Sequence, residues 1–276
     1  MTQAMDWQGD VGRTWAESYT LTDRAFGGLT QHLLEQIDRL GGSAVLDIGC
    51  GAGELSLAIA RQRPQARVVG VDISEALVAA AAERAGSRAQ VSFAVADAGN
   101  WQLADFRPDL LVSRHGVMFF ADPPAAFAHL HDLAASDAHL VFSCFRDRSL
   151  NPWASGIGAL LPPELVVAPA DPREPGPFAF ADPAYVEGIL AAGGWRNIAF
   201  EPFDFAYVAG VGERAVAEAC AFFNRIGPAA SALSAIRGTP AEAGFQARLA
   251  AWVEHNASAG LVAFPAATWI VTARRG

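Results

Sequence analysis

Three glycines lie in the pattern most able to bind a ligand. Gly49, Gly51 and Gly53 stand between a short apolar run and a segment with helical periodicity. Glycines at a turn from strand to helix let a ligand approach the backbone closely, because a side chain there would clash. Many nucleotide sites share such a loop, so the pattern predicts a ligand without choosing one.

The residues around the loop argue against a dinucleotide. The G-x-G-x-x-G fingerprint requires a glycine at position 54, where Glu54 would bring a carboxylate close to a pyrophosphate. Asp47, just before the turn, suits a ligand with an ammonium group better than one with phosphates. The chain also contains no lysine, so it lacks the Tyr-x-x-x-Lys pair of many nicotinamide-dependent oxidoreductases. That class is disfavoured.

Two more aspartates end predicted strands. Asp72 follows Gly53 by about 20 residues, where nucleotide-binding α/β folds place an acid that accepts both ribose hydroxyls. Asp97 ends the next predicted strand, where it or its neighbouring backbone can accept from or flank an adenine amino edge. Ligands of open α/β sheets bind at the carboxyl ends of the strands, so Asp47, Asp72 and Asp97 are expected to form one site.

Strands and helices must alternate to bring these acids together. Apolar runs bounded by turn residues predict strands, and apolar stripes at helical spacing predict helices between them. This alternation favours a mainly parallel sheet with helices on both faces. The predicted strands are 44–48, 68–72, 91–96, 109–113, 139–145, 198–208 and 267–273, and the early helices are 29–40, 54–63, 75–85 and one that begins at Pro123.

The second half of the chain has a different texture. Residues 151–177 contain seven of the sixteen prolines, so we expect no core helix there. We expect segments 147–177 and 212–258, the latter helical, to form a cap over the strand ends. Residues 1–276 are predicted to form a single domain.

Composition excludes several partners. The net charge is −9 and no basic residues cluster, so a nucleic acid is not an expected partner. The three cysteines are scattered, which predicts neither a disulfide framework nor a zinc knuckle and fits a reducing cytoplasm. No leader and no membrane-spanning stretch is recognisable. His129 and His131 lie two apart on a predicted helix, so we predict no metal site.

The motifs resemble those of the class I S-adenosylmethionine (SAM) dependent methyltransferases. Residues 45–53, VLDIGCGAG, look like the first motif of that family, residues 70–74, GVDIS, like the second, and residues 95–98, VADA, like the third. The resemblance covers residues 40–146 and is strongest to small-molecule enzymes similar to those of ubiquinone and menaquinone biosynthesis. It implies a Rossmann-like fold of about seven strands, mostly parallel with the last strand antiparallel, plus a helical and loop cap.

The resemblance also implies site residues. Family members hold SAM with the glycine loop around its methionine part, the second acid on the ribose and the third at the adenine, and the exit of the fourth strand lies beside the methyl donor. The implied cofactor-binding residues are Asp47, Gly49, Gly51, Gly53, Asp72, Ile73, Asp97, Ala98, Ser113 and Arg114.

The N-terminal segment is a predicted lid. In similar enzymes this segment folds over SAM, and residues 1–28 carry Trp15 and Tyr19, of which Tyr19 is a candidate cofactor contact. Packing of both rings against the first helix is the alternative.

His115 is a candidate general base. Methyl transfer from a sulfonium depends mainly on alignment and exclusion of water, and a base is required only if the acceptor must lose a proton. His115 follows the fourth strand, and the unperturbed pKa of a histidine lies near the working range. The alternative is a buried histidine that shapes the pocket.

The predicted reaction transfers a methyl group from SAM to a small apolar or aromatic metabolite and releases S-adenosylhomocysteine (SAH). Cap aromatics are candidates to line the acceptor pocket. Two alternatives stay open: a peptide or protein side chain as acceptor, and a protein that binds SAM without catalysis. The candidate cap aromatics are Trp153, Phe178, Phe180, Phe222, Phe223, Phe245 and Trp252.

Overall fold

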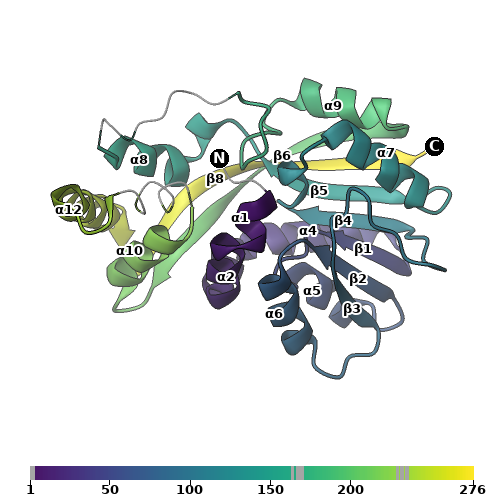
Figure 1. Cartoon of the computed structure of the whole chain (residues 1–276), viewed down its shortest axis with the longest axis horizontal. Coiled ribbons are helices and arrows are strands. Elements are labelled where there is room, and N and C mark those ends of the chain that lie inside the picture. Colours follow the sequence, from purple (N-terminus) through teal and green to yellow (C-terminus); the bar gives the residue numbers. More distant parts are fainter. Residues whose placement is uncertain (1–3, 163–164, 166–170, 228–229, 231–232, 234–235) are drawn as a thin grey trace.

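The computed structural model is built on one mixed sheet (Figure 1). It describes residues 4–162, 165, 171–227, 230, 233 and 236–276. Parts of the predicted lid and cap, including Pro163 and Pro169, lie outside these residues. The strands are β1 (Ala44–Ile48), β2 (Arg67–Asp72), β3 (Val91–Val95), β4 (Leu110–Arg114), β5 (His139–Phe145), β6 (Trp195–Val211), β7 (Ala257–Ser258) and β8 (Leu261–Arg275).

The strand order is β3-β2-β1-β4-β5-β8-β6, with β7 paired to β8. Strands β1 to β5 pair in parallel, and β8 runs antiparallel to both β5 and β6. The predicted mostly parallel sheet with an antiparallel last strand is confirmed, and the short β7 adds a strand to the seven expected. The central strands are buried, with Val45 and Leu46 fully enclosed, as apolar strands covered on both faces must be.

Helices cover both faces of the sheet (Figure 1). Side-chain N-caps begin α6 and α7, since the side chain of Ser74 accepts from the N–H of Leu77 and that of Asp122 accepts from the N–H of Ala125. The helices are α1 (Ala4–Gln8), α2 (Asp10–Glu17), α3 (Tyr19–Ala25), α4 (Gly27–Leu40), α5 (Glu54–Gln62), α6 (Glu75–Ala85), α7 (Pro123–Leu133), α8 (Pro152–Leu160), α9 (Pro183–Ala192), α10 (Ala215–Arg225) and α12 (Pro240–His255), with 3₁₀ turns at Val117–Phe119 and Arg148–Leu150.

The strands next to the predicted cap, β6 and β8, are longer than predicted. β6 and β8 extend past β5 as an antiparallel pair, and α8, α10 and α12 gather around the extension (Figure 1). The expectation that the proline-rich segment contains no core helix is wrong, because α8 buries Trp153 and Ile157. Pro152 occupies the first turn of α8, where its missing N–H is not needed, and the next proline follows the helix.

Asn151 links the start of α8 to the sheet through hydrogen bonds. The residue is fully buried, and its amide group donates to the carbonyl oxygen of Ala267 at 3.2 Å. Its Oδ1 accepts from the N–H of Ala267 at 3.0 Å and from the indole of Trp153 at 3.1 Å. A single amide side chain therefore joins the start of α8 to β8.

The N-terminal helices lie against the start of α6. Gly12 on α2 meets Ser74 so closely that a Cβ on the glycine would lie 2.2 Å from the Ser74 hydroxyl oxygen. On its other side, α2 reaches α10 through an ion pair between Glu17 and Arg225 at 2.5 Å. Within the ranges that the structure describes, no helix is long and apolar enough to cross a membrane.

Candidate functional site

The glycine loop connects β1 to α5. Gly49, Gly51 and Gly53 have φ angles of 66°, 54° and 80°, in the left-handed region that favours glycine. A Cβ on Gly49 would lie 2.8 Å from the Cα of Gly116, and one on Gly53 would lie 2.9 Å from the Phe93 ring, so these two glycines permit close packing. A Cβ on Gly51 would meet open space instead. The loop thus presents bare backbone at its middle glycine.

Asp47 is buried at the end of β1. Its carboxylate accepts from the Ser56 hydroxyl at 2.5 Å, and the residue is 1% exposed. Burial raises the pKa of Asp47 to about 6, and the Ser56 hydrogen bond and the charge of Arg114 only partly oppose that shift. A buried carboxylate of this kind gains from a cationic ligand group placed beside it.

Asp72 ties the glycine loop to the end of β2. Its two carboxylate oxygens accept from the N–H groups of Gly51 and Ser74, both at 2.9 Å. Burial raises the pKa of Asp72, although these backbone hydrogen bonds oppose the rise. A carboxylate has about four lone-pair directions. Each oxygen therefore keeps capacity for a further donor such as a ribose hydroxyl.

The third acid and its neighbours form the outer edge of the predicted site. Asp97 is exposed after β3, and its carboxylate accepts from the N–H of Gly99 at 2.8 Å. Ala98 is buried, and Ile73 after β2 is half-buried. The three predicted acids therefore lie at the carboxyl ends of β1, β2 and β3, which are adjacent in the sheet. Their burial decreases from Asp47 to Asp97.

Ser113 and Arg114, at the end of β4, have different surroundings. The Ser113 hydroxyl donates to the Ile48 carbonyl oxygen at 2.7 Å, so it joins β4 to β1. Arg114 forms an ion pair with Glu54 at the start of α5 and donates to the Thr30 hydroxyl at 2.8 Å. Burial lowers the pKa of Arg114, while nearby aspartates oppose that. Its guanidinium thus links α4 to α5 through these two contacts.

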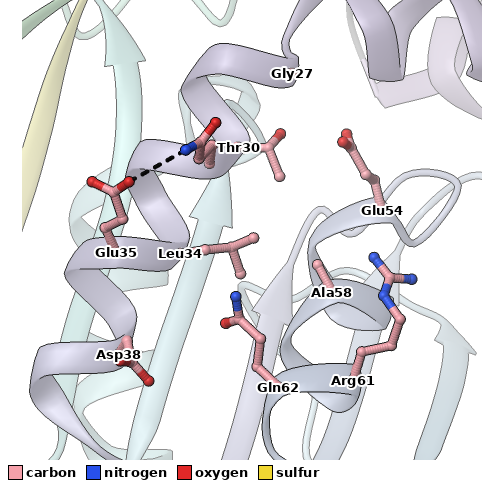
Figure 2. Close-up of a pocket in the computed structure, with 10 residues that line it drawn as sticks. Gly27, Thr30, Leu34, Glu35, Asp38, Glu54, Ala58, Arg61 and Gln62 are labelled. Atoms are coloured by element: carbon pink, nitrogen blue, oxygen red, sulfur yellow. Dashed lines mark hydrogen bonds between the residues drawn. The ribbon is translucent and has the colours of Figure 1, made fainter.

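A groove of about 640 Å³ runs between α4 and α5 (Figure 2). Glu35 and Asp38 line it from α4, and Glu54 and Arg61 line it from α5. Its lining includes none of the three predicted acids and no glycine of the loop. The groove is therefore separate from the predicted cofactor residues, with Glu54 as its link to the end of β4.

His115 lies directly beyond β4 with a φ of 63°, which non-glycine residues seldom adopt. Its imidazole stacks on the Phe145 ring, with centroids 4.1 Å apart, and meets the Phe26 ring edge-on at 5.4 Å. Burial lowers the pKa of His115 to about 3, and the charge of Arg114 acts in the same direction. A neutral ring with so low a pKa is a weak proton acceptor, so the geometry favours the pocket-shaping alternative. The general-base role stays a prediction.

Tyr19 approaches the glycine loop through Arg84 of α6. The Arg84 guanidinium lies 4.3 Å from the Tyr19 ring centroid and forms an ion pair with Asp23 at 2.6 Å. It also donates to the carbonyl oxygen of Ala52 within the loop at 2.7 Å. Arg84 therefore couples the N-terminal helices to the loop.

The aromatic residues of the N-terminal helices and those of the predicted cap have different surroundings. Trp7 of α1 meets the rings of Trp15 and Phe119 edge-on, at 5.3 and 5.2 Å, which places α1 against the exit of β4. Among the predicted cap aromatics, Phe178 and Trp252 are half-buried and border the surface. The others are buried in the core: Trp153, Phe180, Phe222, Phe223 and Phe245.

Sequence reasoning missed three residues that organise this region. Trp7, Arg84 and Asn151 act through partners far along the chain, so no local spacing identifies them. The proline after Asn151 was the one available signal, because it marks the start of a helix. Within the described part of the chain, no group of three or more His, Cys, Asp or Glu residues could hold a metal ion.

Part of the chain is similar to known methyltransferases. Residues 45–137 match a family model described as a methyltransferase domain. The trans-aconitate 2-methyltransferase of Variovorax paradoxus (strain S110) is 30% identical over 118 residues, which are 43% of this chain and 42% of that protein. A release factor glutamine methyltransferase of Xylella fastidiosa (strain Temecula1) is 36% identical over 110 residues, 39% of this chain and 37% of that protein. The chain thus spans about two fifths of the length of these relatives.

Solved structures extend the likeness to the whole fold. Phosphoethanolamine N-methyltransferase 2 of Haemonchus contortus, in complex with phosphomonomethylethanolamine and SAH, superposes with a TM-score of 0.54 at 17% identity. The match covers 96% of this chain and 60% of that one. At this identity the likeness concerns the fold alone.

Proposed function

We propose that residues 45–137 form a methyltransferase domain of the class I type that binds SAM, and that the chain methylates a small apolar or aromatic metabolite. The observation that carries the proposal is the bond between the Gly51 N–H and Asp72 at 2.9 Å. This hydrogen bond joins a loop whose middle residue has no side chain to a carboxylate that can accept further hydrogen bonds. That combination suits a ligand with both a ribose and an aliphatic tail.

The residues of the loop fit SAM. Asp72 would accept from the ribose hydroxyls, and the open space over Gly51 leaves room for the methionine part. Asp47 lies near enough to the loop to favour the ammonium group through its buried negative charge. Asp97, with Ile73 and Ala98, would border the adenine. When bound, SAM supplies a methyl group on a positively charged sulfur, and the acceptor atom bonds to that carbon as the sulfur takes the electron pair of the breaking bond.

The protein contributes alignment and exclusion of water. The N-terminal helices would act as the lid, which is supported by the contact of Gly12 with Ser74 and by the Tyr19 ring on Arg84, whose guanidinium donates to the Ala52 carbonyl oxygen. Segments 147–177 and 212–258 form the acceptor-binding cap. Holding the two reactants in line in a water-free site supplies most of the acceleration in such a displacement.

A protein or peptide acceptor is the second candidate. The observation in its favour is the likeness to a release factor glutamine methyltransferase. That likeness is confined to about two fifths of each chain. The family model matches residues 45–137, whereas the proposed cap segments 147–177 and 212–258 lie outside that range, so the comparisons support the reaction more than the acceptor.

Calorimetric titration with SAH, with NAD as a control ligand, tests the proposal. We expect SAH to bind and NAD not to bind. Asp72→Ala should weaken SAH binding by about tenfold or more, because a charged group loses its hydrogen bonds to the ligand, whereas Asp132→Ala on the exposed side of α7 should leave it unchanged. Unchanged SAH affinity in Asp72→Ala would refute the ribose assignment, and preference for NAD would refute the proposed function.

Release of SAH then separates catalysis from simple binding. The protein with SAM and a mixture of small aromatic acceptors should produce SAH continuously. A peptide mixture that supports release while the metabolites do not would favour the second candidate. Binding of SAH without release under either condition would indicate a non-catalytic SAM-binding protein.

A further inference from the structure

His115 lies between the glycine loop and the aromatic part of the cap. The next residue, Gly116, touches the loop, since a Cβ on it would lie 2.9 Å from the Cα of Gly49. On the other side, the His115 ring stacks on Phe145, which also contacts the ring of Phe178 at 5.7 Å. His115 therefore lies next to both the glycine loop and the aromatic side chains of the predicted cap.

One ring nitrogen of His115 is left without a partner. Nδ1 lies 3.4 Å from the Ser143 hydroxyl, but Nε2 is buried and has no hydrogen-bond partner among the described residues. A buried polar atom without a partner costs about 1–3 kcal/mol. Such an atom in a native structure requires an explanation.

The backbone of His115 points in the same direction. A φ of 63° is unfavourable for a residue with a side chain, and residues held in this region concentrate at ligand sites. Packing between Phe26 and Phe145 fixes the ring in place despite that cost. His115 therefore carries two unfavourable features, a positive φ and a buried Nε2 without a hydrogen-bond partner. Both are found where its ring lies between two aromatic rings.

We propose that His115 is a positioning residue whose Nε2 hydrogen-bonds the acceptor, and that the acceptor is an uncharged aromatic molecule with a hydroxyl group. The inference rests on the proposed methyl transfer and adds the substrate class to it. The surrounding rings of Phe26, Phe145 and Phe178 favour a flat apolar body. Because the imidazole is neutral, it offers a hydrogen bond but no charge to a carboxylate.

The matched probes are 2-naphthol and naphthalene, which differ by one hydroxyl group. Their affinities are measured by equilibrium dialysis against protein saturated with SAH. We expect the wild type to prefer 2-naphthol by roughly tenfold, the effect of one hydrogen bond to a buried group. His115→Phe keeps the stacking ring but removes the nitrogen, so it should bind both probes equally. His115→Gln should restore part of the preference.

His32→Phe is the control. The His32 ring also stacks on a phenylalanine, Phe203, with centroids 3.9 Å apart and planes 6° apart, but it lies on α4 beside Glu201. The same substitution there should leave the preference for 2-naphthol intact. SAH affinity should be equal in His115→Phe and the wild type, which shows that the site has folded.

The possible outcomes are distinct. An unchanged preference in His115→Phe, or binding of neither probe to the SAH-saturated wild type, overturns the role of His115 and leaves the methyl-transfer proposal standing. Failure of the wild type to bind SAH overturns the proposed function and this inference with it. Loss of the preference in His32→Phe as well would also contradict the inference, because the effect would not belong to the site.

Discussion

Asp47→Asn tests whether the buried negative charge of Asp47 destabilises the folded protein. Burial raises the pKa of Asp47 from 3.8 to about 6 in the folded protein. Two pKa units correspond to about 3 kcal/mol, which is the upper limit of the destabilisation by the ionised carboxylate. Asparagine keeps an oxygen that can accept from Ser56 but removes the charge.

The effect depends on pH in a defined direction. Between pH 4 and pH 6 the folded state binds more protons at Asp47 than the unfolded state does, so the stability of the wild type falls as the pH rises. The destabilisation is complete above the folded pKa of about 6 and is relieved towards pH 4. From pH 5 to pH 8 the advantage of Asp47→Asn over the wild type should therefore grow by about 1.4 kcal/mol.

Urea unfolding at pH 5 and pH 8 measures this change. Comparing the two pH values removes any constant cost of burying the new amide. Asp38→Asn, at an exposed position of α4, is the control and should show no growing advantage. Asp47→Asn should at the same time weaken SAH binding by roughly tenfold, because the ammonium group loses a charged partner. An advantage that shrinks from pH 5 to pH 8, or stays constant, would refute the reasoning.

Three further substitutions probe the loop, the lid and the cap. Gly49 has a φ of 66°, and a Cβ at this position would lie 2.8 Å from the Cα of Gly116, so Gly49→Ala should destabilise the protein by about 1–3 kcal/mol and weaken SAH binding. Urea unfolding measures the stability and calorimetry the SAH affinity. Wild-type values in both would contradict the packing argument. Gly12→Val should displace α2 from Ser74 and speed proteolysis of the first 25 residues in the folded protein, so an unchanged cleavage rate would count against close lid packing. Asn151→Ala should cost about 3 kcal/mol or more in thermal unfolding, because it leaves several buried partners unpaired; a loss under about 1 kcal/mol would show that the cap is held otherwise.

Local signals in the sequence determined the nucleotide-binding half. The bounds of β1 (Ala44–Ile48) and β5 (His139–Phe145) agree with those predicted, because short apolar runs between turn residues define buried parallel strands. The glycine loop was equally evident, since a positive φ at three alternate positions requires glycine. Strand ends in a parallel sheet meet at one edge, so Asp47 and Asp72 were expected near each other.

Tertiary structure decided what each side chain contacts. Arg114 binds Glu54 and Thr30, and His115 lies between Phe26 and Phe145, through partners more than 25 residues away. The low pKa of His115 follows from burial, which spacing does not reveal.

The extent of the cap was also a tertiary outcome. β6 and β8 lengthen because each satisfies the other's backbone groups beyond the end of β5, and neither strand carries a local signal for that pairing. Sequence patterns with periods of two to four residues determined the elements and the cofactor loop. Only the folded chain determined the surroundings of His115 and of the predicted cap, because those surroundings are made by contacts between segments that are distant in the sequence.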